Sequence, residues 1–210
     1  MPSLYRLLEH PVVYRVSEAV AAPGAAWMLD RVIARLLADI GGAAPLIDVG
    51  CGPASPLGRQ GLDPIGLDLS ARYVATLRAH GGRGVVAAAE RLPFATGSIG
   101  GIWSVGLLHH LPDPVVQGVM RECARVAKRP GGYLAIIDGI LPRSPWRRPV
   151  AHWIRRLDRG RFMRSEARLR ALLHPGFRWS TQRVTYTLVG HEALVCVCCF
   201  EPVGAGGVGA

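Results

Sequence analysis

Apolar positions along the chain follow two spacings, one typical of buried strands and one typical of amphipathic helices. Short runs of branched apolar side chains bounded by Gly or Pro indicate strands that are buried on both faces. The predicted strands are Leu46–Val49, Ile65–Ser70, Val85–Ala88, Ile102–Leu108, Tyr133–Asp138, Trp179–Leu188 and Glu192–Phe200. Apolar residues three and four positions apart indicate helices between these runs. The predicted helices are Ala25–Ile40, Ala71–His80, one that begins at Pro114 and ends at the sequence KRPGG, and Ser165–Leu173.

Strands and helices alternate from Leu46 to Asp138, and this order predicts the fold class. Such alternation is typical of an α/β protein whose parallel sheet carries helices on both faces. We expect N-terminal helices over residues 1–42 and a disordered tail over residues 204–210. The chain has no internal repeat and, at 210 residues, the size of one ordinary domain. We therefore predict a single domain over residues 1–203.

Acidic residues and glycines meet at the ends of the first two strands. The sequence LIDVGCGPASPLG places Asp48 in the first strand and Gly50, Cys51 and Gly52 after it. The second strand ends in Asp68. A glycine turn followed by an acid on the next strand is how an open α/β sheet binds a ribose-bearing cofactor, because a carboxylate accepts bonds from two hydroxyls. The same glycines also fit an ordinary strand-to-helix turn.

Basic residues are concentrated in one segment. The chain has a formal net charge of +10. Between Leu141 and Arg183 there are twelve arginines and two acids, Asp158 and Glu166, whereas the remainder of the chain carries thirteen basic and thirteen acidic residues. Within this segment, residues 141–164 are predicted to form a basic insertion that caps the domain after the fifth strand.

The cysteines and the apolar runs indicate the compartment. Cys196, Cys198 and Cys199 crowd one apolar run without metal-ligand spacing, so we expect core residues in a reducing cytosol and no metal site. No apolar run approaches the roughly 20 residues of a membrane span, and the N-terminus lacks a signal-peptide core. These features predict a cytoplasmic protein.

Five motifs in chain order resemble those of one family. DVGCGPAS, GLDLS, AERLPF, SVGLLHHLPD and RECARVAKRPGGYLAIID are similar to motifs of the class I S-adenosylmethionine-dependent methyltransferases, in the small-molecule branch that includes ubiquinone- and menaquinone-type C-methylases. The resemblance covers residues 46–138 and continues more loosely to Phe200. It implies a doubly wound, Rossmann-like sheet of seven strands, mostly parallel, with an antiparallel last strand. It also implies S-adenosyl-L-methionine as cofactor and S-adenosyl-L-homocysteine as product.

The resemblance assigns roles to individual residues. The turn from Asp48 to Gly52 would line the methionine part of the cofactor, Asp68 would bind the ribose hydroxyls, and Leu69 would contact the adenine. The other cofactor-binding residues that it implies are Ala89 and Glu90 at the adenine edge and Ser104, Val105 and Gly106 near the sulfonium. The sequence departs from the family at Ala88, where an acid usually reaches the adenine amino group. That contact is expected instead from Glu90 or from the backbone.

His110 is the predicted catalytic base. It follows the fourth strand at the carboxyl edge, where open α/β sheets bind ligands, and a neutral imidazole suits proton abstraction near pH 7. In some relatives a histidine at this position works with a tyrosine of the N-terminal segment, which here would be Tyr14 or Tyr5. Alternatively, the HHLPD turn is a structural corner whose histidines bond to backbone.

Three interpretations fit the basic insertion. Val150, Trp153, Ile154 and Leu157 align on one face of a predicted helix. Residues 143–164 could therefore lie on an anionic membrane, cover the pocket and attract an acidic substrate, or form a solvated surface helix. Nucleic acid is the least favoured partner, because the chain shows neither an RNA-binding module nor the NPPY-type loop of enzymes that methylate bases.

These features predict a methyltransferase that acts on a small or lipid-like acceptor by in-line O-, C- or N-methylation. Two alternatives remain open at this point. One is a protein that binds the cofactor without methyl transfer, and the other is an RNA methylase that uses the arginine-rich segment.

Overall fold

The computed structural model describes residues 22, 24–128, 130–143, 146 and 162–200. Its strands are β1 (Leu46–Val49), β2 (Ile65–Asp68), β3 (Arg83–Val86), β4 (Gly101–Val105), β5 (Tyr133–Ile140), β6 (Ser180–Thr185) and β7 (Glu192–Cys199). Its helices are α3 (Ala25–Ile40), α4 (Ala71–Ala79), α5 (Asp113–Val126) and α7 (Glu166–Leu172), with short 3-10 helices η1 (Gly58–Gln60) and η2 (Leu108–His110).

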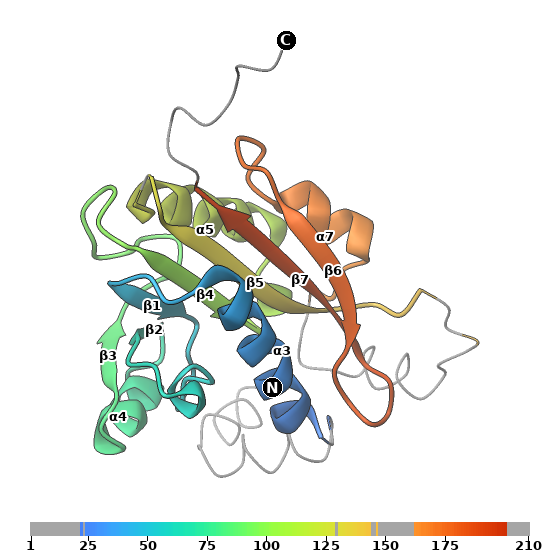
Figure 1. Ribbon diagram of the computed structural model, residues 1–210, viewed down its shortest axis with the longest axis horizontal. Helices are drawn as coiled ribbons and strands as arrows, with labels where there is room; N and C mark the ends of the chain where they lie inside the picture. Colours follow the sequence, from blue (N-terminus) through green and yellow to red (C-terminus); the bar gives the residue numbers. More distant parts are fainter. Residues whose placement is uncertain (1–21, 23, 129, 144–145, 147–161, 201–210) are drawn as a thin grey trace, which may run out of the picture.

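The strands form one sheet in the order β3-β2-β1-β4-β5-β7-β6 (Figure 1). Strands β1 to β5 pair in parallel. Strand β7 lies between β5 and β6 and is antiparallel to both. The predicted seven-stranded, mostly parallel sheet with an antiparallel last strand is therefore confirmed.

Helices cover both faces of this sheet (Figure 1). On one face, Ile33 of α3 packs into a cluster with Trp103 of β4 and Ile137 of β5. On the other face, α5 and α7 pack against the alternate residues of the same strands, Ile102 and Ile136 among them. Because side chains alternate along a strand, the even-numbered residues of β5 face α5 and α7.

Serine caps fix where two helices begin. The Ser70 hydroxyl accepts a hydrogen bond from the Tyr73 backbone N–H, and the Ser165 hydroxyl accepts one from the Arg168 backbone N–H. Such caps satisfy N–H groups of the first turn that have no partner inside the helix. They confirm the helices predicted behind the second strand and after the basic insertion.

The predicted strand Ile102–Leu108 is wrong at its carboxyl end. Strand β4 ends at Val105, Gly106 has a φ of 70°, and Leu108 already belongs to η2. The apolar run continues past the strand because Leu108 is buried in the core from a turn. Burial alone thus produced the pattern that we interpreted as strand.

The predicted strand Val85–Ala88 is also displaced, since β3 covers Arg83–Val86. Its second residue is Gly84, which seldom indicates a strand. A Cβ atom at Gly84 would lie 3.0 Å from a side-chain methyl carbon of Val74 in α4. The glycine therefore lets α4 approach the sheet closely, and this packing hid the start of the strand.

Three further expectations have separate outcomes. Cys196 and Cys198 are core residues as expected, whereas Cys199, the last residue of β7, is exposed. No helix among the described residues is long and apolar enough to cross a membrane. Residues 1–21 and 204–210, predicted as helices and tail, lie outside the described residues.

A buried arginine joins the end of the basic insertion to the domain. Arg164 donates through Nη1 to the Leu108 carbonyl at 2.7 Å, through Nη2 to the Leu111 carbonyl, and through Nε to Asp113 Oδ1 at 2.7 Å. These bonds hold the turn between β4 and α5. They also lower the pKa of Asp113, chiefly through the hydrogen bond from Arg164.

We expect Arg164→Ala to lower the free energy of unfolding by about 2–4 kcal/mol, because it leaves buried carbonyls without a donor. Urea denaturation measures this change. Arg168→Ala is the matched control, since Arg168 pairs with the same Asp113 but is 60% exposed. It should cost no more than about 1 kcal/mol. Equal losses in the two variants would show that burial does not matter at Arg164.

Candidate active site at the carboxyl edge of the sheet

The turn after β1 requires its glycines. Gly50 has a φ of 78°, and a Cβ atom there would lie 2.7 Å from Leu107 Cδ1. The backbone N–H groups of Gly50 and Cys51 both donate to the Leu67 carbonyl of β2, at 2.7 and 3.0 Å. Gly52 has a φ of 61°, and nothing lies within 4 Å of a Cβ atom there. The turn is thus fixed on its inner side and open at Gly52.

Asp68 is fixed against this turn at the end of β2. Its Oδ2 accepts from the Gly52 backbone N–H at 3.0 Å, and its Oδ1 accepts from the Ser70 backbone N–H at 2.8 Å. Each carboxylate oxygen can accept a further bond, so the pair of oxygens is oriented for two adjacent hydroxyls. Leu69, next along the chain, is 75% exposed. An exposed apolar side chain beside an oriented carboxylate suits an adenine and its ribose.

Asp48 is a buried carboxyl with one oxygen unsatisfied. Its Oδ2 accepts from the Ser55 hydroxyl at 2.6 Å, whereas Oδ1 has no hydrogen-bond partner among the described residues. Burial, and secondarily the negative charge of Asp68, raise its pKa from 3.8 to about 6. An unpaired buried acceptor is costly, and this one lies directly before the glycine turn. Its position favours a ligand that brings a donor or a positive charge.

The other predicted cofactor residues lie along the same edge. Ser104 is buried at the end of β4, and its hydroxyl has no hydrogen-bond partner among the described residues. Val105 and Gly106 follow it, and the Gly106 backbone N–H donates to the Ile137 carbonyl of β5. Ala89 packs against the core. Glu90 is exposed, with its Cβ close to Gly118 of α5.

The histidine pair after β4 has two different environments. His109 Nδ1 lies 2.6 Å from Asp138 Oδ1 of β5, and the side chain of His109 is largely buried. Because a carboxylate only accepts, Nδ1 of His109 carries the proton of this bond. Asp138 Oδ2 also accepts from the Leu108 backbone N–H. His110 is exposed, and its ring centroid lies 4.1 Å from that of His109.

Sequence reasoning assigned no role to Asp138. The available signal was an acid in the otherwise apolar fifth strand, YLAIID, but its partner lies 29 residues away along the chain. His110 keeps its predicted place at the carboxyl edge. The structure brings His109, rather than His110, to the buried carboxylate. Tyr5 and Tyr14, the candidate partners of the base, lie outside the described residues.

Most of the described arginines in the arginine-rich segment pair with acids. Among the described residues, Arg143, Arg164, Arg168, Arg170 and Arg183 form ion pairs with acids. The predicted amphipathic helix over residues 144–157 lies almost wholly outside the described residues. Within the described part of the chain, no cluster of three or more His, Cys, Asp or Glu side chains could hold a metal ion.

Comparison with known proteins shows what the chain is similar to. Residues 47–136 match the family model described as a methyltransferase domain. Over these residues, which are less than half of the chain, it is similar to the class I S-adenosylmethionine-dependent methyltransferases. The matched residues run from β1 to β5 and include both carboxylates at the glycine turn.

Two curated proteins illustrate what this chain is similar to. It is 35% identical to the ubiquinone biosynthesis O-methyltransferase of Xanthomonas oryzae over 127 residues, which are 56% of this chain and 50% of that protein. It is 31% identical to the 27-O-demethylrifamycin SV methyltransferase of Amycolatopsis mediterranei, over 56% of this chain and 48% of that protein. The chain thus spans about half the length of these curated relatives.

A solved structure shows the same fold. A SAM-dependent methyltransferase from Archaeoglobus fulgidus superposes with a TM-score of 0.70 and 15% identity, and the match covers 88% of this chain and 98% of that one. The Rossmann-like architecture deduced from the sheet order therefore extends through the closing strands β6 and β7.

The site residues fit the cofactor of this family. Asp68 offers two oriented oxygens for ribose hydroxyls, and Gly52 leaves room for close approach. The unsatisfied Oδ1 of Asp48 suits the cationic amino group of the methionine part. These observations concern the chain alone, and the roles of Asp48 and Asp68 toward the cofactor stay predictions.

The raised pKa of Asp48 predicts a specific effect of pH on stability. Between 3.8 and about 6 the folded protein retains a proton that the unfolded chain has released, so the free energy of unfolding falls as pH rises through this window. Asp48→Asn removes this loss and keeps an acceptor for Ser55. We expect the stability of the variant relative to wild type to increase by up to about 3 kcal/mol from pH 4 to pH 7, as measured by urea denaturation.

Asp39→Asn is the control for this measurement, because Asp39 is an exposed acid on α3. Its effect on stability should stay nearly constant over the same pH range. Parallel pH curves for wild type and Asp48→Asn would contradict the raised pKa.

Proposed function

We propose that this chain transfers the methyl group of S-adenosylmethionine to a small-molecule acceptor. The observation that carries the proposal is the pair of carboxylates at the glycine turn, Asp48 with an unsatisfied buried oxygen and Asp68 oriented by two backbone N–H groups. A protein that only binds the cofactor would need the same pair. The histidine and buried carboxylate beside β4 and β5 favour chemistry over binding alone.

Different residues of the chain would have different roles in this reaction. When bound, S-adenosylmethionine supplies an activated methyl group. Asp68 holds the ribose hydroxyls, Asp48 pairs with the amino group, and the Gly50–Gly52 turn lets the backbone approach. The chain must also align the acceptor and, for a hydroxyl acceptor, remove its proton.

The histidine pair supplies the candidate base, and the geometry favours His109 over His110. Asp138 fixes the His109 ring with Nδ1 protonated, so Nε2 is left as the basic nitrogen. The carboxylate also stabilises the imidazolium that forms when the ring takes a proton. A Cβ atom placed on Gly106 would lie 3.8 Å from His109 Cε1, so the ring lies beside the residues expected near the sulfonium.

Among oxygen, carbon and nitrogen, we favour a hydroxyl oxygen as the atom that receives the methyl group. The two curated relatives described above are named for O-methylation, and a hydroxyl needs the base that the histidine pair can supply. A cytoplasmic location and contact of residues 143–164 with an anionic membrane stay predictions. An RNA acceptor is disfavoured, because most of the arginines described in the basic segment already pair with acids.

Asp68→Asn tests the cofactor site. We expect it to weaken binding of S-adenosylhomocysteine by roughly 10- to 150-fold, because charge-assisted hydrogen bonds worth about 1.5–3 kcal/mol are lost. Isothermal titration calorimetry measures the affinity, and thermal unfolding verifies that the variant is folded. Asp63→Asn makes the same charge change at an exposed surface acid and should leave affinity unchanged. Unaltered binding by Asp68→Asn would refute the assignment of the ribose site.

A second experiment tests the base. His109→Ala should lower turnover by about 10²–10⁴-fold with little change in S-adenosylhomocysteine affinity, as expected for loss of a general base. Asp138→Asn should act in the same direction. Turnover is measured as S-adenosylhomocysteine released with a panel of small phenols and alcohols, 3,4-dihydroxybenzoate included.

His110→Ala is the matched control, because His110 is the exposed neighbour of the same turn. Turnover should stay near the wild-type rate in this variant and fall in His109→Ala. The opposite result would restore His110 as the base, as the sequence alone suggested. If neither variant loses activity, both histidines are structural.

A further inference from the structure

A groove opens just beyond the carboxyl end of β5. Its volume is about 530 Å³. Its apolar part is formed by Leu141, Pro142 and Ala167, and its basic part by Arg143, Arg170 and Arg183. Neither the cofactor site nor the histidine pair includes a residue of this arginine groove. An apolar wall with a few charged groups is the usual composition of a small-molecule site.

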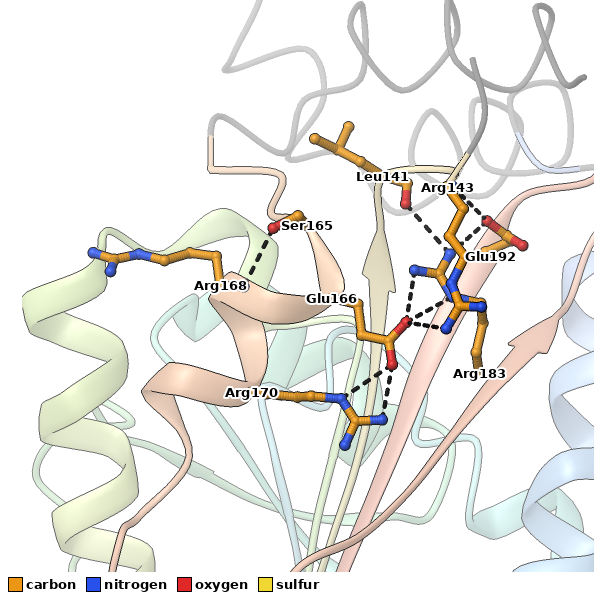
Figure 2. Close-up of polar contacts among 8 residues, drawn as sticks. All are labelled: Leu141, Arg143, Ser165, Glu166, Arg168, Arg170, Arg183 and Glu192. Atoms are coloured by element: carbon orange, nitrogen blue, oxygen red, sulfur yellow. Dashed lines mark hydrogen bonds and ion pairs between the residues drawn. The ribbon is translucent and has the colours of Figure 1, made fainter. Parts of the chain in front are cut away.

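The arginines of the groove converge on one carboxylate (Figure 2). Arg170 bonds Glu166 Oε1 through Nε at 3.0 Å and Nη2 at 2.8 Å, and Arg183 bonds Oε2 through Nε at 2.9 Å. These hydrogen bonds, from Arg170 first and Arg183 second, lower the pKa of Glu166 to about 2. Arg183 also donates to Glu192 Oε2 at 2.6 Å. Three arginines therefore share two carboxylates, which leaves one positive charge in excess.

Arg143 carries this excess. Its side chain is 74% exposed, and the one side-chain contact that the described residues give it is to Glu166 Oε2 at 3.3 Å. Arg170 and Arg183 already satisfy both oxygens of Glu166 with shorter bonds. The guanidinium has five donors, so most of those of Arg143 remain for a ligand. Its planar shape matches a carboxylate or a phosphate.

The groove lies within small-molecule reach of the His109–Asp138 pair. Asp138 lies in β5, and Leu141 follows the last residue of this strand. Three residues of extended chain span about 10 Å. Asp138 is an even-numbered residue of β5 and so points to the face that α7 covers, the face on which Glu166 lies. The Leu141 backbone N–H also donates to the Arg164 carbonyl, which ties the groove to the turn that holds His109.

We propose that the arginine groove binds an anionic group of the methyl acceptor, a carboxylate or phosphate on an apolar scaffold, with Arg143 as its principal donor. The inference rests on the proposed methyl transfer, because it places the acceptor between the groove and the histidine pair. Arg143 acts in binding only and touches no reacting atom.

Equilibrium fluorescence with a matched pair of probes tests the groove directly. 8-Anilinonaphthalene-1-sulfonate is apolar and anionic, whereas N-phenyl-1-naphthylamine has nearly the same rings without the charge. We expect wild-type protein to bind the sulfonate more tightly. Arg143→Gln should weaken sulfonate binding about tenfold, the effect of losing one charge-assisted hydrogen bond, and leave the neutral probe unaffected.

Arg168→Gln is the matched control. It removes the same charge from an exposed arginine that extends from the other side of α7, away from Glu166 (Figure 2). It should change neither affinity. Equal loss of sulfonate binding in both variants would mean that only net charge matters, and unchanged binding in Arg143→Gln would mean that the groove is a structural ion-pair network. Either result overturns the proposal.

Two further measurements separate this inference from others. Calorimetry with S-adenosylhomocysteine should give equal affinities for wild type and Arg143→Gln. If wild type fails to bind S-adenosylhomocysteine, the methyltransferase proposal is contradicted, whereas the binding of anions in the groove is not. Vesicles of phosphatidylglycerol address the membrane alternative. If Arg143→Gln abolishes sedimentation with these vesicles but leaves sulfonate binding intact, Arg143 serves a membrane surface and the proposal is wrong.

Discussion

Two buried charges hold the turn after β4, and the candidate active site depends on that turn. Asp138 accepts from the Leu108 backbone N–H and from His109, and Arg164 donates to the carbonyls of Leu108 and Leu111. Removing either group would leave buried partners unsatisfied, which is why the turn has one conformation. That conformation places His109 beside Gly106. It also joins the end of the basic insertion to the sheet.

The sequence was sufficient for elements whose signals are local. α3 and β1 have the predicted bounds, because periodicity depends on neighbouring residues. Asp68 could be placed for the same reason, since it ends a recognisable strand. The strand prediction at Ile102–Leu108 failed because Leu108 is buried by tertiary packing and not by strand structure. The pairing of His109 with Asp138 has no local signal at all.

Asp48 illustrates why a residue proposed to bind a ligand can be unfavourable for stability. Its burial raises the pKa of the carboxyl to about 6, and one oxygen has no partner among the described residues. A core optimised for stability would not retain such a group. A site that binds a cationic amino group gains from it, because the ligand supplies the missing partner. The unpaired oxygen of Asp48 therefore lowers the stability of the free protein and strengthens the binding of a cationic ligand.

The basic segment shows how total charge can mislead. Twelve arginines against two acids suggested a positive surface, yet Asp113 and Glu192, which lie outside that segment, and Glu166 within it pair with five of the six arginines in its described part. Arginine forms several directed bonds at once, so it can fasten a turn or a helix where lysine would act as a point charge. Within the groove, one exposed guanidinium, that of Arg143, is in excess above the apolar side chains. A single excess charge in a defined groove selects one anionic group, whereas a charged surface attracts anions of every kind.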